Sequence, residues 1–302
     1  AWIAAPNTDI TDIKAAPVGE LDVELRSWND GDNPYELALD GAGTALNNVA
    51  LGQSLTADHV LRFQDLMPQT NFQLATYALA ELFTRKDEAE IAELRKAGQA
   101  IDAVHAQVPK LLQPGRTEAE VAQELEELIL QEHTVIDFVI VGSGPNGANP
   151  HHSFSDRVLA EGEPVVVDIG GTLPSGYHSD CTRTYVVGGD VSKAPQDFQD
   201  AYAVLADAQA AARAAAHPGS TAAEIDAITR KAIAAAGWGD NFVHRTGHGI
   251  GLSTHEEPFI MEGNDLTLEE GMAFSLEPGI YVEGKWGMRL EDIVVLTNNG
   301  YE

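Results

Sequence analysis

PGRTEAEV (residues 114–121) recurs as PGSTAAEI (residues 218–225), 104 positions later in the chain. In both copies a threonine is followed three residues later by a glutamate. This spacing is typical of a capping box, in which each of the two side chains binds a backbone N–H that the first turn of a helix leaves free. The two copies therefore predict helices that begin at equivalent points of two related segments.

The apolar pattern around each copy extends the repeat. Apolar residues follow the capping boxes at helical spacing, at Val121, Leu125, Leu128 and Ile129 and at Ile225, Ile228 and Ala232. A further helical stripe precedes each copy, formed by Ile91, Leu94, Ile101, Val104 and Val108 and by Phe198, Tyr202, Leu205 and Ala212. Each segment is therefore expected to contain two helices.

Two β-rich runs end each segment, at 165–169 with 182–187 and at 273–281 with 289–296. The order helix, helix, strands thus occurs twice, from about residue 86 to 189 and from about 194 to 297. The order predicts an α+β fold with an internal pseudo-twofold repeat.

The residues before the repeat follow a different pattern. They predict strands at 21–27, 49–51 and 71–75 and a helix at 56–67, whereas the first twenty residues show little core-forming pattern. We therefore expect a small α/β amino-terminal domain at residues 1–84 and the repeat-containing domain at residues 85–302.

Composition limits the classes of partner. The 302 residues include 47 acidic residues and 18 Lys and Arg, a formal net charge of −29, which disfavours nucleic acid and anionic membrane surfaces. The apolar runs fall short of a membrane span. The single cysteine, Cys181, excludes an intrachain disulfide and a cysteine-rich zinc site, and it fits a reducing cytoplasm.

Four acidic residues occupy the β-rich runs that end the two segments. Asp168 follows three valines and Asp180 opens the next predicted strand, while Glu277 and Glu291 stand in the corresponding runs of the second segment. Spacings of 12 and 14 residues are consistent with pairing across a hairpin in each segment. Four carboxylates that meet in a core repel one another strongly, and two divalent cations would neutralise their charge. We therefore expect a dinuclear metal site.

A histidine cluster offers a further ligand. His244, His248 and His255 lie within twelve residues and among three glycines, which permit close backbone approach and positive φ. His248 has a glycine on each side and is the best candidate ligand. His151, in a loop rich in glycine and asparagine, is a fourth candidate.

The motifs PHHSFSDR, VVVDIGG, SDCTRTY, HRTGHGIGLSTHEEP, SLEPGIY and GMRLEDIVVLT occur in this order within residues 86–298. Their combination resembles the Xaa-Pro peptidase branch of the pita-bread metallopeptidases, which includes proline dipeptidase and aminopeptidase P. The resemblance implies the metal ligands Asp168, Asp180, His248, Glu277 and Glu291. It implies substrate and transition-state contacts by His151, His244 and His255, and an arginine beside the ligands at Arg289. The sequence departs from that branch in a longer turn between Asp168 and Asp180 and in a shorter amino-terminal region.

The resemblance also implies an activity. We expect hydrolysis of the Xaa-Pro bond of small peptides by a cytoplasmic homodimer, with Glu277 as the proton shuttle and His255 or His151 at the oxyanion. One imidazole and four carboxylates favour Mn²⁺ or Co²⁺, with Zn²⁺ as an alternative. A dipeptidase is favoured over an aminopeptidase P that acts on longer peptides. Three other interpretations are a methionine aminopeptidase, a metal-free creatinase-like enzyme and a non-catalytic binding module on the same fold.

Overall fold

Both predicted capping boxes are present in the computed structural model, which describes residues 1–298 and 300–302. They open α8 (Glu118–Ile129) and α10 (Ala222–Ala235). In each box the threonine hydroxyl accepts the glutamate N–H, at 3.1 and 3.2 Å, and the carboxylate accepts the threonine N–H at 2.8 Å. The local sequence thus sets the start of both helices.

The chain divides into two units, Ala1–Ala80 and Glu81–Glu302. The first contains two parallel strand pairs, β1 (Trp2–Pro6) with β2 (Glu24–Trp28) and β3 (Asn48–Leu51) with β4 (Asn71–Leu74). Its helices are α1 (Ile10–Ala15), α2 (Pro34–Leu39), α3 (Ala57–Leu66) and α4 (Ala75–Ala78), and α5 (Ala80–Thr84) follows at its end.

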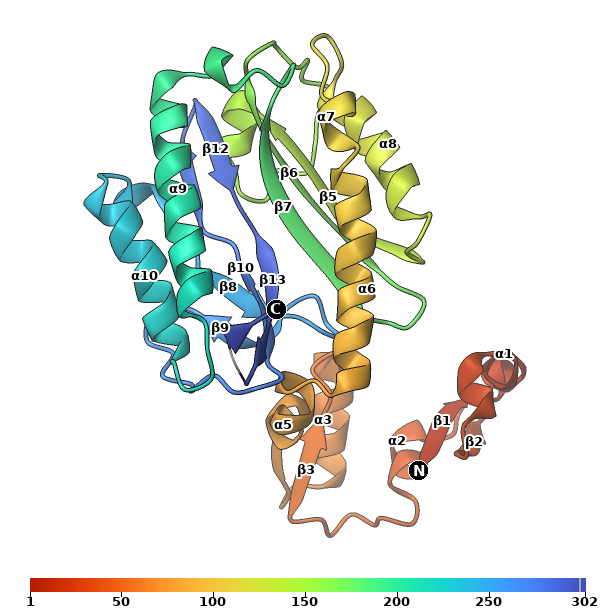
Figure 1. Cartoon of the computed structure of the whole chain (residues 1–302). Coiled ribbons are helices and arrows are strands. Elements are labelled where there is room, and N and C mark those ends of the chain that lie inside the picture. The colour runs from red at the N-terminus through yellow and green to blue at the C-terminus, as the bar shows by residue number, and fades with distance from the viewer. Residues whose placement is uncertain (299) are drawn as a thin grey trace. The chain divides into compact units, whose positions relative to one another are not determined.

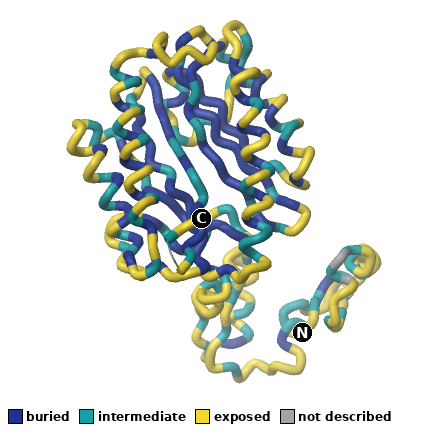
Figure 2. The backbone as a smooth tube through the Cα atoms, in the orientation of Figure 1, coloured by how far each residue is buried: buried dark blue, intermediate teal, exposed yellow. Residues whose placement is uncertain are grey.

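The predictions for this first unit were correct for α3, β3 and β4. The predicted strand at 21–27 begins later, at Glu24, and β1 was missed in a stretch that shows little core-forming pattern. The reason is that the unit has little core. Among its described side chains, the buried apolar ones are Ala5, Leu39 and Met67, and Figure 2 shows a largely exposed chain there.

The first part of the second unit contains an antiparallel sheet in the order β5 (Val135–Ser143), β6 (Pro164–Thr172) and β7 (His178–Val186). Helix α6 (Glu88–His105) packs on β7 and α8 on β5, with α7 (Val108–Leu111) between them in the chain (Figure 1). The predicted stripe residues Ile101, Val104, Val121, Leu125 and Ile129 are all buried in the core that joins these helices to the sheet.

The rest of the unit contains two further helices and a second sheet. Helix α9 (Gln196–Ala215) packs on α10. They precede an antiparallel sheet in the order β14 (Gly300–Tyr301), β13 (Asp292–Thr297), β10 (Ala273–Leu276), β8 (Gly247–Gly249) and β9 (Glu256–Ile260). A separate hairpin joins β11 (Gly279–Val282) to β12 (Trp286–Arg289).

Two details of the second half differ from the sequence-based expectation. Ala232 is exposed, and the buried stripe of α10 continues at Ile233, because the helix turns its next residue toward the core. The two β-rich runs predicted in this half, at 273–281 and 289–296, are each divided between two strands. The run at 273–281 breaks at Glu277, where the N–H leaves the ladder and donates to the Thr246 carbonyl at 2.7 Å, and Pro278 has no N–H for a ladder.

No helix in the described part of the chain combines the length and apolar character that a bilayer span needs.

Candidate metal centre

Two carboxylates lie on one face of the first sheet. In the antiparallel register Asp168 is opposite Thr182 and Asp180 is opposite Gly170, so the two aspartates are diagonal neighbours. Both are buried. The two strands continue to Thr172 and start again at His178, so Asp180 does not open its strand as expected from the sequence. Asp180 therefore lies inside β7, where the ladder fixes its direction.

Two more carboxylates lie just beyond the end of the ladder between β10 and β13 in the second sheet. The β10–β13 ladder ends with Leu276 opposite Asp292, so Glu277 and Glu291 stand just beyond it. The hairpin of β11 and β12 lies between them in the chain, so the pair is not joined by a simple turn as the spacing suggested. The Glu291 N–H donates to the Thr182 carbonyl of β7 at 3.1 Å, which brings Glu291 to the first sheet.

His248 lies in β8 and is buried. Its Nε2 is 3.2 Å from Glu277 Oε1 and 3.5 Å from Asp180 Oδ2. Its Nδ1 is 3.0 Å from the Gly249 carbonyl, which accepts the Nδ1 proton, so Nε2 is the nitrogen that faces the carboxylates and would bind a metal.

The glycines beside His248 serve close packing. A Cβ at Gly247 would stand 1.8 Å from the Ser275 carbonyl oxygen, and one at Gly249 would stand 2.2 Å from that of Glu257. Neither glycine has positive φ, contrary to one of the two reasons offered from the sequence.

Three overlapping groups of possible ligand atoms result, each with its atoms within 4.8 Å of one another. They are Asp168, Asp180 and Glu291; His248, Glu277 and Glu291; and Asp180, His248 and His255. All five residues predicted as ligands belong to these groups.

The buried oxygens of the cluster fit metal ions. Arg289 pairs with Asp168 Oδ2, and the Thr182 hydroxyl donates to Glu291 Oε2 at 2.8 Å. The second oxygens, Asp168 Oδ1 and Glu291 Oε1, are buried without a hydrogen-bond partner. Because an unpaired buried carboxylate oxygen is costly, a bound cation would give these two atoms the partner that they lack.

Burial and the neighbouring charges shift the pKa values of the clustered carboxylates in different directions. Burial, together with Glu291, raises the pKa of Asp180, and burial together with Glu277 raises the pKa of Glu291. Burial opposes ionisation of Glu277 as well, yet the hydrogen bond to His248 and the charge of Arg289 lower its pKa to about 2. Cations would replace the protons that Asp180 and Glu291 otherwise retain.

Arg289 connects the first sheet with the hairpin that carries it. Its guanidinium pairs with Asp168, donates to the Thr182 hydroxyl at 3.1 Å and donates to the Tyr281 hydroxyl at 2.6 Å. Tyr281 also lies 2.9 Å from Nε2 of His244. Tyr281 ends the SLEPGIY motif, from which no role was predicted for it. Its position in β11 opposite β12, beside the predicted Arg289, is the signal that could have identified it.

The other three histidines lie at different distances from the carboxylates. His255 is an exposed residue whose ring centroid is 4.1 Å from that of His248, and desolvation together with the neighbouring His248 lowers its pKa to about 4. His244 contacts Tyr281, and His151 is exposed. Among the described residues, the three ligand groups include neither His244 nor His151.

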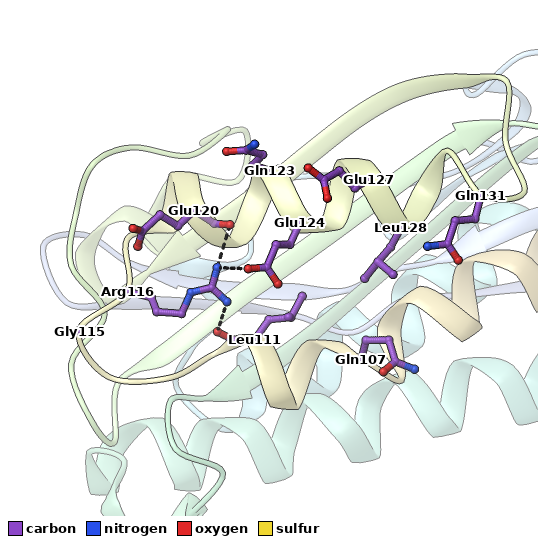
Figure 3. A pocket seen from close by; sticks show the side chains of 10 residues that line it. All are labelled: Gln107, Leu111, Gly115, Arg116, Glu120, Gln123, Glu124, Glu127, Leu128 and Gln131. Atoms are coloured by element: carbon purple, nitrogen blue, oxygen red, sulfur yellow. Dashed lines mark hydrogen bonds and ion pairs between the residues drawn. The ribbon is translucent and has the colours of Figure 1, made fainter.

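A groove of about 840 Å³ lies elsewhere, over α7 and α8 (Figure 3). Its one arginine, Arg116, is paired with Glu124 at 2.7 Å. None of its lining residues belongs to the carboxylate and histidine cluster, so it offers no comparable chemistry.

Comparison with known proteins gave consistent matches. The model of metallopeptidase family M24 matches residues 92–298. A probable dipeptidase PepE of Mycobacterium tuberculosis is 50% identical over 299 residues, which are 99% of this chain and 78% of that protein. The crystal structure of dipeptidase PepE from Mycobacterium ulcerans has a TM-score of 0.91 at 50% identity, over 100% of this chain and 80% of that one. Prolidase from Pyrococcus furiosus has a TM-score of 0.85 at 31% identity, over 99% and 85%.

Proposed function

This chain belongs to metallopeptidase family M24, and from that membership and the geometry of the site we propose that it is a metal-dependent Xaa-Pro dipeptidase. The observation that carries the proposal is the cluster of four carboxylates and His248, with two buried oxygens that lack a partner. Asp168, Asp180, His248, Glu277 and Glu291 would hold two divalent ions. The oxygen-rich ligand set favours Mn²⁺ or Co²⁺, with Zn²⁺ as the alternative.

When bound, the ions supply Lewis acidity toward the scissile carbonyl and the attacking water. Glu277 takes the proton that the attacking water releases and transfers it to the leaving nitrogen. This carboxylate is held by His248 and by the Ser275 hydroxyl, which donates to Oε1 at 3.1 Å. A low pKa keeps this carboxylate ionised.

The histidines around the ions contact the substrate. His255, beside His248, and His151 stabilise the oxyanion, and His244 contacts the peptide with Tyr281 behind it. Arg289 orients Asp168. The Xaa-Pro bond has no N–H that a protease could bind by a hydrogen bond. A site that accepts the proline ring and protonates a tertiary nitrogen is therefore suited to this bond.

We also propose that the second unit is a duplicated pita-bread domain, residues 85–302, preceded by an amino-terminal α/β domain at residues 1–84. The hydrogen bonds around the two capping boxes support the duplication. Gly115 donates to the Leu159 carbonyl at 2.9 Å, and Gly219 donates to the Leu268 carbonyl at 2.8 Å. Isolated bridges stand at matching places, Thr117 with Val158 and Thr221 with Thr267.

The family resemblance further supports a homodimer, and the absence of any possible internal disulfide fits the cytoplasm. Sedimentation analysis of the metal-loaded protein tests the dimer.

Substrate length tests the proposed activity. A dipeptidase accepts the free carboxylate of proline and closes the space of a third residue. The metal-loaded enzyme should therefore cleave Ala-Pro and Met-Pro at least tenfold faster than Ala-Pro-Ala in kcat/KM, a discrimination of about 1.4 kcal/mol. Equal or faster cleavage of the tripeptide would identify an aminopeptidase P, and no cleavage of either with any of the three metals would reject the peptidase.

A further inference from the structure

One glutamate of α8 is fully buried and carries no role in the chemistry above. Glu118 has 0% exposure, and its carboxylate accepts hydrogen bonds from both the N–H and the hydroxyl of Ser143, at 2.7 and 2.6 Å. It also accepts from the Asn146 amide at 3.1 Å, the His152 ring at 2.9 Å and the Ser155 hydroxyl at 2.7 Å. All of these donors lie in one segment, residues 143–155.

The charge of Glu118 matters for these contacts. An ionised carboxylate accepts hydrogen bonds at both oxygens and accepts more strongly than a neutral group. Burial opposes ionisation of Glu118, but the bonds from Ser143, Ser155 and His152 outweigh it and lower its pKa. The folded protein therefore holds a buried anion on which the 143–155 segment converges.

The segment that Glu118 holds carries His151. His152, the next residue, bonds Glu118 directly, and the carbonyl of Pro150, the preceding residue, is 3.4 Å from the Arg289 guanidinium. The segment also presses on β12, because a Cβ at Gly287 would stand 1.8 Å from the Gly147 carbonyl oxygen. The residues on both sides of His151 are thus held by charged groups, Pro150 through its carbonyl and His152 through its ring.

The second half uses the same device one helical turn later. The residue that corresponds to Glu118 in α10 is Ala222, which is buried. The buried acid there is Asp226, whose counterpart in α8 is Ala122. Asp226 accepts the Thr246 N–H at 3.2 Å and the Thr246 hydroxyl at 2.7 Å.

Asp226 also pairs with Arg230 at 2.8 Å. Arg230 in turn donates to the His244 carbonyl at 3.0 Å. Each half therefore contains, outside the metal cluster, a buried carboxylate that holds a segment with a histidine assigned to the substrate.

We propose that Glu118 is a positioning residue for His151, and that Asp226 is its counterpart for His244. The inference rests on the substrate roles proposed for these two histidines. A misplacement of about 1 Å in a substrate-positioning group is enough to reduce a rate by roughly a hundredfold, so anchors that touch no substrate can control turnover.

Hydrogen exchange measured by mass spectrometry tests the anchoring without reference to activity. In the metal-loaded Glu118→Gln variant, amides of residues 143–155 should exchange at least about tenfold faster, while those of 244–249 stay unchanged. Asp226→Asn should give the reverse pattern. Glu120→Gln, in the same turn of α8 but exposed in the capping box, is the matched control and should leave both segments unchanged. Unaltered exchange of 143–155 in Glu118→Gln would overturn the proposal.

Double-mutant cycles test the functional coupling. Glu118→Gln should lower kcat/KM by about tenfold or more in the otherwise native enzyme but less than about threefold in the His151→Ala background, with metal content retained. In the His244→Ala background Glu118→Gln should lower kcat/KM by its full factor. Asp226→Asn should lose its effect on kcat/KM in the His244→Ala background and keep it in the His151→Ala background.

Losses that multiply in both backgrounds would overturn the positioning role. If the Glu118→Gln protein is inactive or unfolded, Ser155→Ala takes its place in the same cycles. That variant removes one hydrogen-bond donor and leaves the Glu118 carboxylate in place. If His151→Ala alone leaves kcat/KM unchanged, the substrate role of His151 fails, and the exchange experiment still decides whether Glu118 holds the segment.

Discussion

Arg289 binds one oxygen of Asp168 and leaves the other buried without a hydrogen-bond partner. The arginine therefore fixes the direction of the aspartate without occupying the atom that a metal ion would take. A planar guanidinium can do this while it also binds Thr182 and Tyr281, because its five N–H groups point in fixed directions.

Arg289→Lys should accordingly lower kcat/KM by roughly ten- to a hundredfold, since an ammonium keeps the charge but cannot reach three acceptors in one plane. Steady-state kinetics and metal analysis measure this. Arg95→Lys, at an exposed pair with Glu302, is the control and should behave as the native enzyme. Native activity in Arg289→Lys would show that charge alone suffices.

Removal of metal should abolish hydrolysis, and Mn²⁺ or Co²⁺ should restore it, because five side chains converge where the ions would bind. The thermal midpoint should also fall on chelation, since ions that bind only the folded state stabilise it. Activity assays and calorimetry of the chelated and reconstituted protein check the two points. Full activity of protein shown to be metal-free would reject the dinuclear site.

The loss of stability on chelation should depend on pH. The pKa values of Asp180 and Glu291 are raised in the metal-free fold, so these groups retain protons that the unfolded chain has released above its ordinary carboxyl pKa of about 4. This contribution is present below that value and is lost as pH rises through the folded pKa values. The gap in thermal midpoint between metal-loaded and metal-free protein should therefore widen from pH 4 to pH 7, and a constant gap would contradict the expectation.

Glu277→Gln should reduce kcat by about a hundredfold or more, because the amide cannot carry the proton to the leaving nitrogen. Glu283→Gln, in the exposed turn between β11 and β12, is the matched control and should leave kcat unchanged. Stopped assays at saturating Ala-Pro measure the difference. A loss confined to KM would remove the proton-transfer role.

His255→Ala and His151→Ala should lower kcat while both metal ions stay bound, since the two residues are assigned to the substrate. For His255 the test is sharp, because its ring lies with Asp180 and His248 in one group of possible ligand atoms. Metal analysis beside kinetics separates the two roles, with the exposed His217→Ala as control. A His255→Ala protein that arrives with one ion missing would make His255 a ligand.

Features that are set by residues close together in the chain could be predicted from the sequence. The starts of α8 and α10 follow from two residues within one turn, and the structure confirms them. The four carboxylates were selected by their matching places in the two segments, and the structure brings them together with His248. Their roles as ligands remain predictions.

Features that depend on distant contacts were not visible in the sequence. Tyr281 gains its place only when β11 pairs with β12 beside His244, and Glu118 only when the 143–155 segment folds back over α8. The glycines beside His248 were noted for two reasons, of which only close packing applies, because the carbonyl that each one faces comes from another strand or loop.

The contribution of Glu291 has a consequence for biosynthesis. Asp168 is translated long before Glu291, and the strand that follows Glu291 lies inside its sheet, between β14 and β10. A nascent chain can fold α6 to β7 while the second half is still on the ribosome, as domains commonly begin to fold during synthesis. It then exposes two aspartates with no partner carboxylates. The proposed set of five ligands is complete only after Glu291 has been synthesised and β13 has joined its sheet, so we expect no full metal complement, and no activity, in a shorter chain that stops before β13.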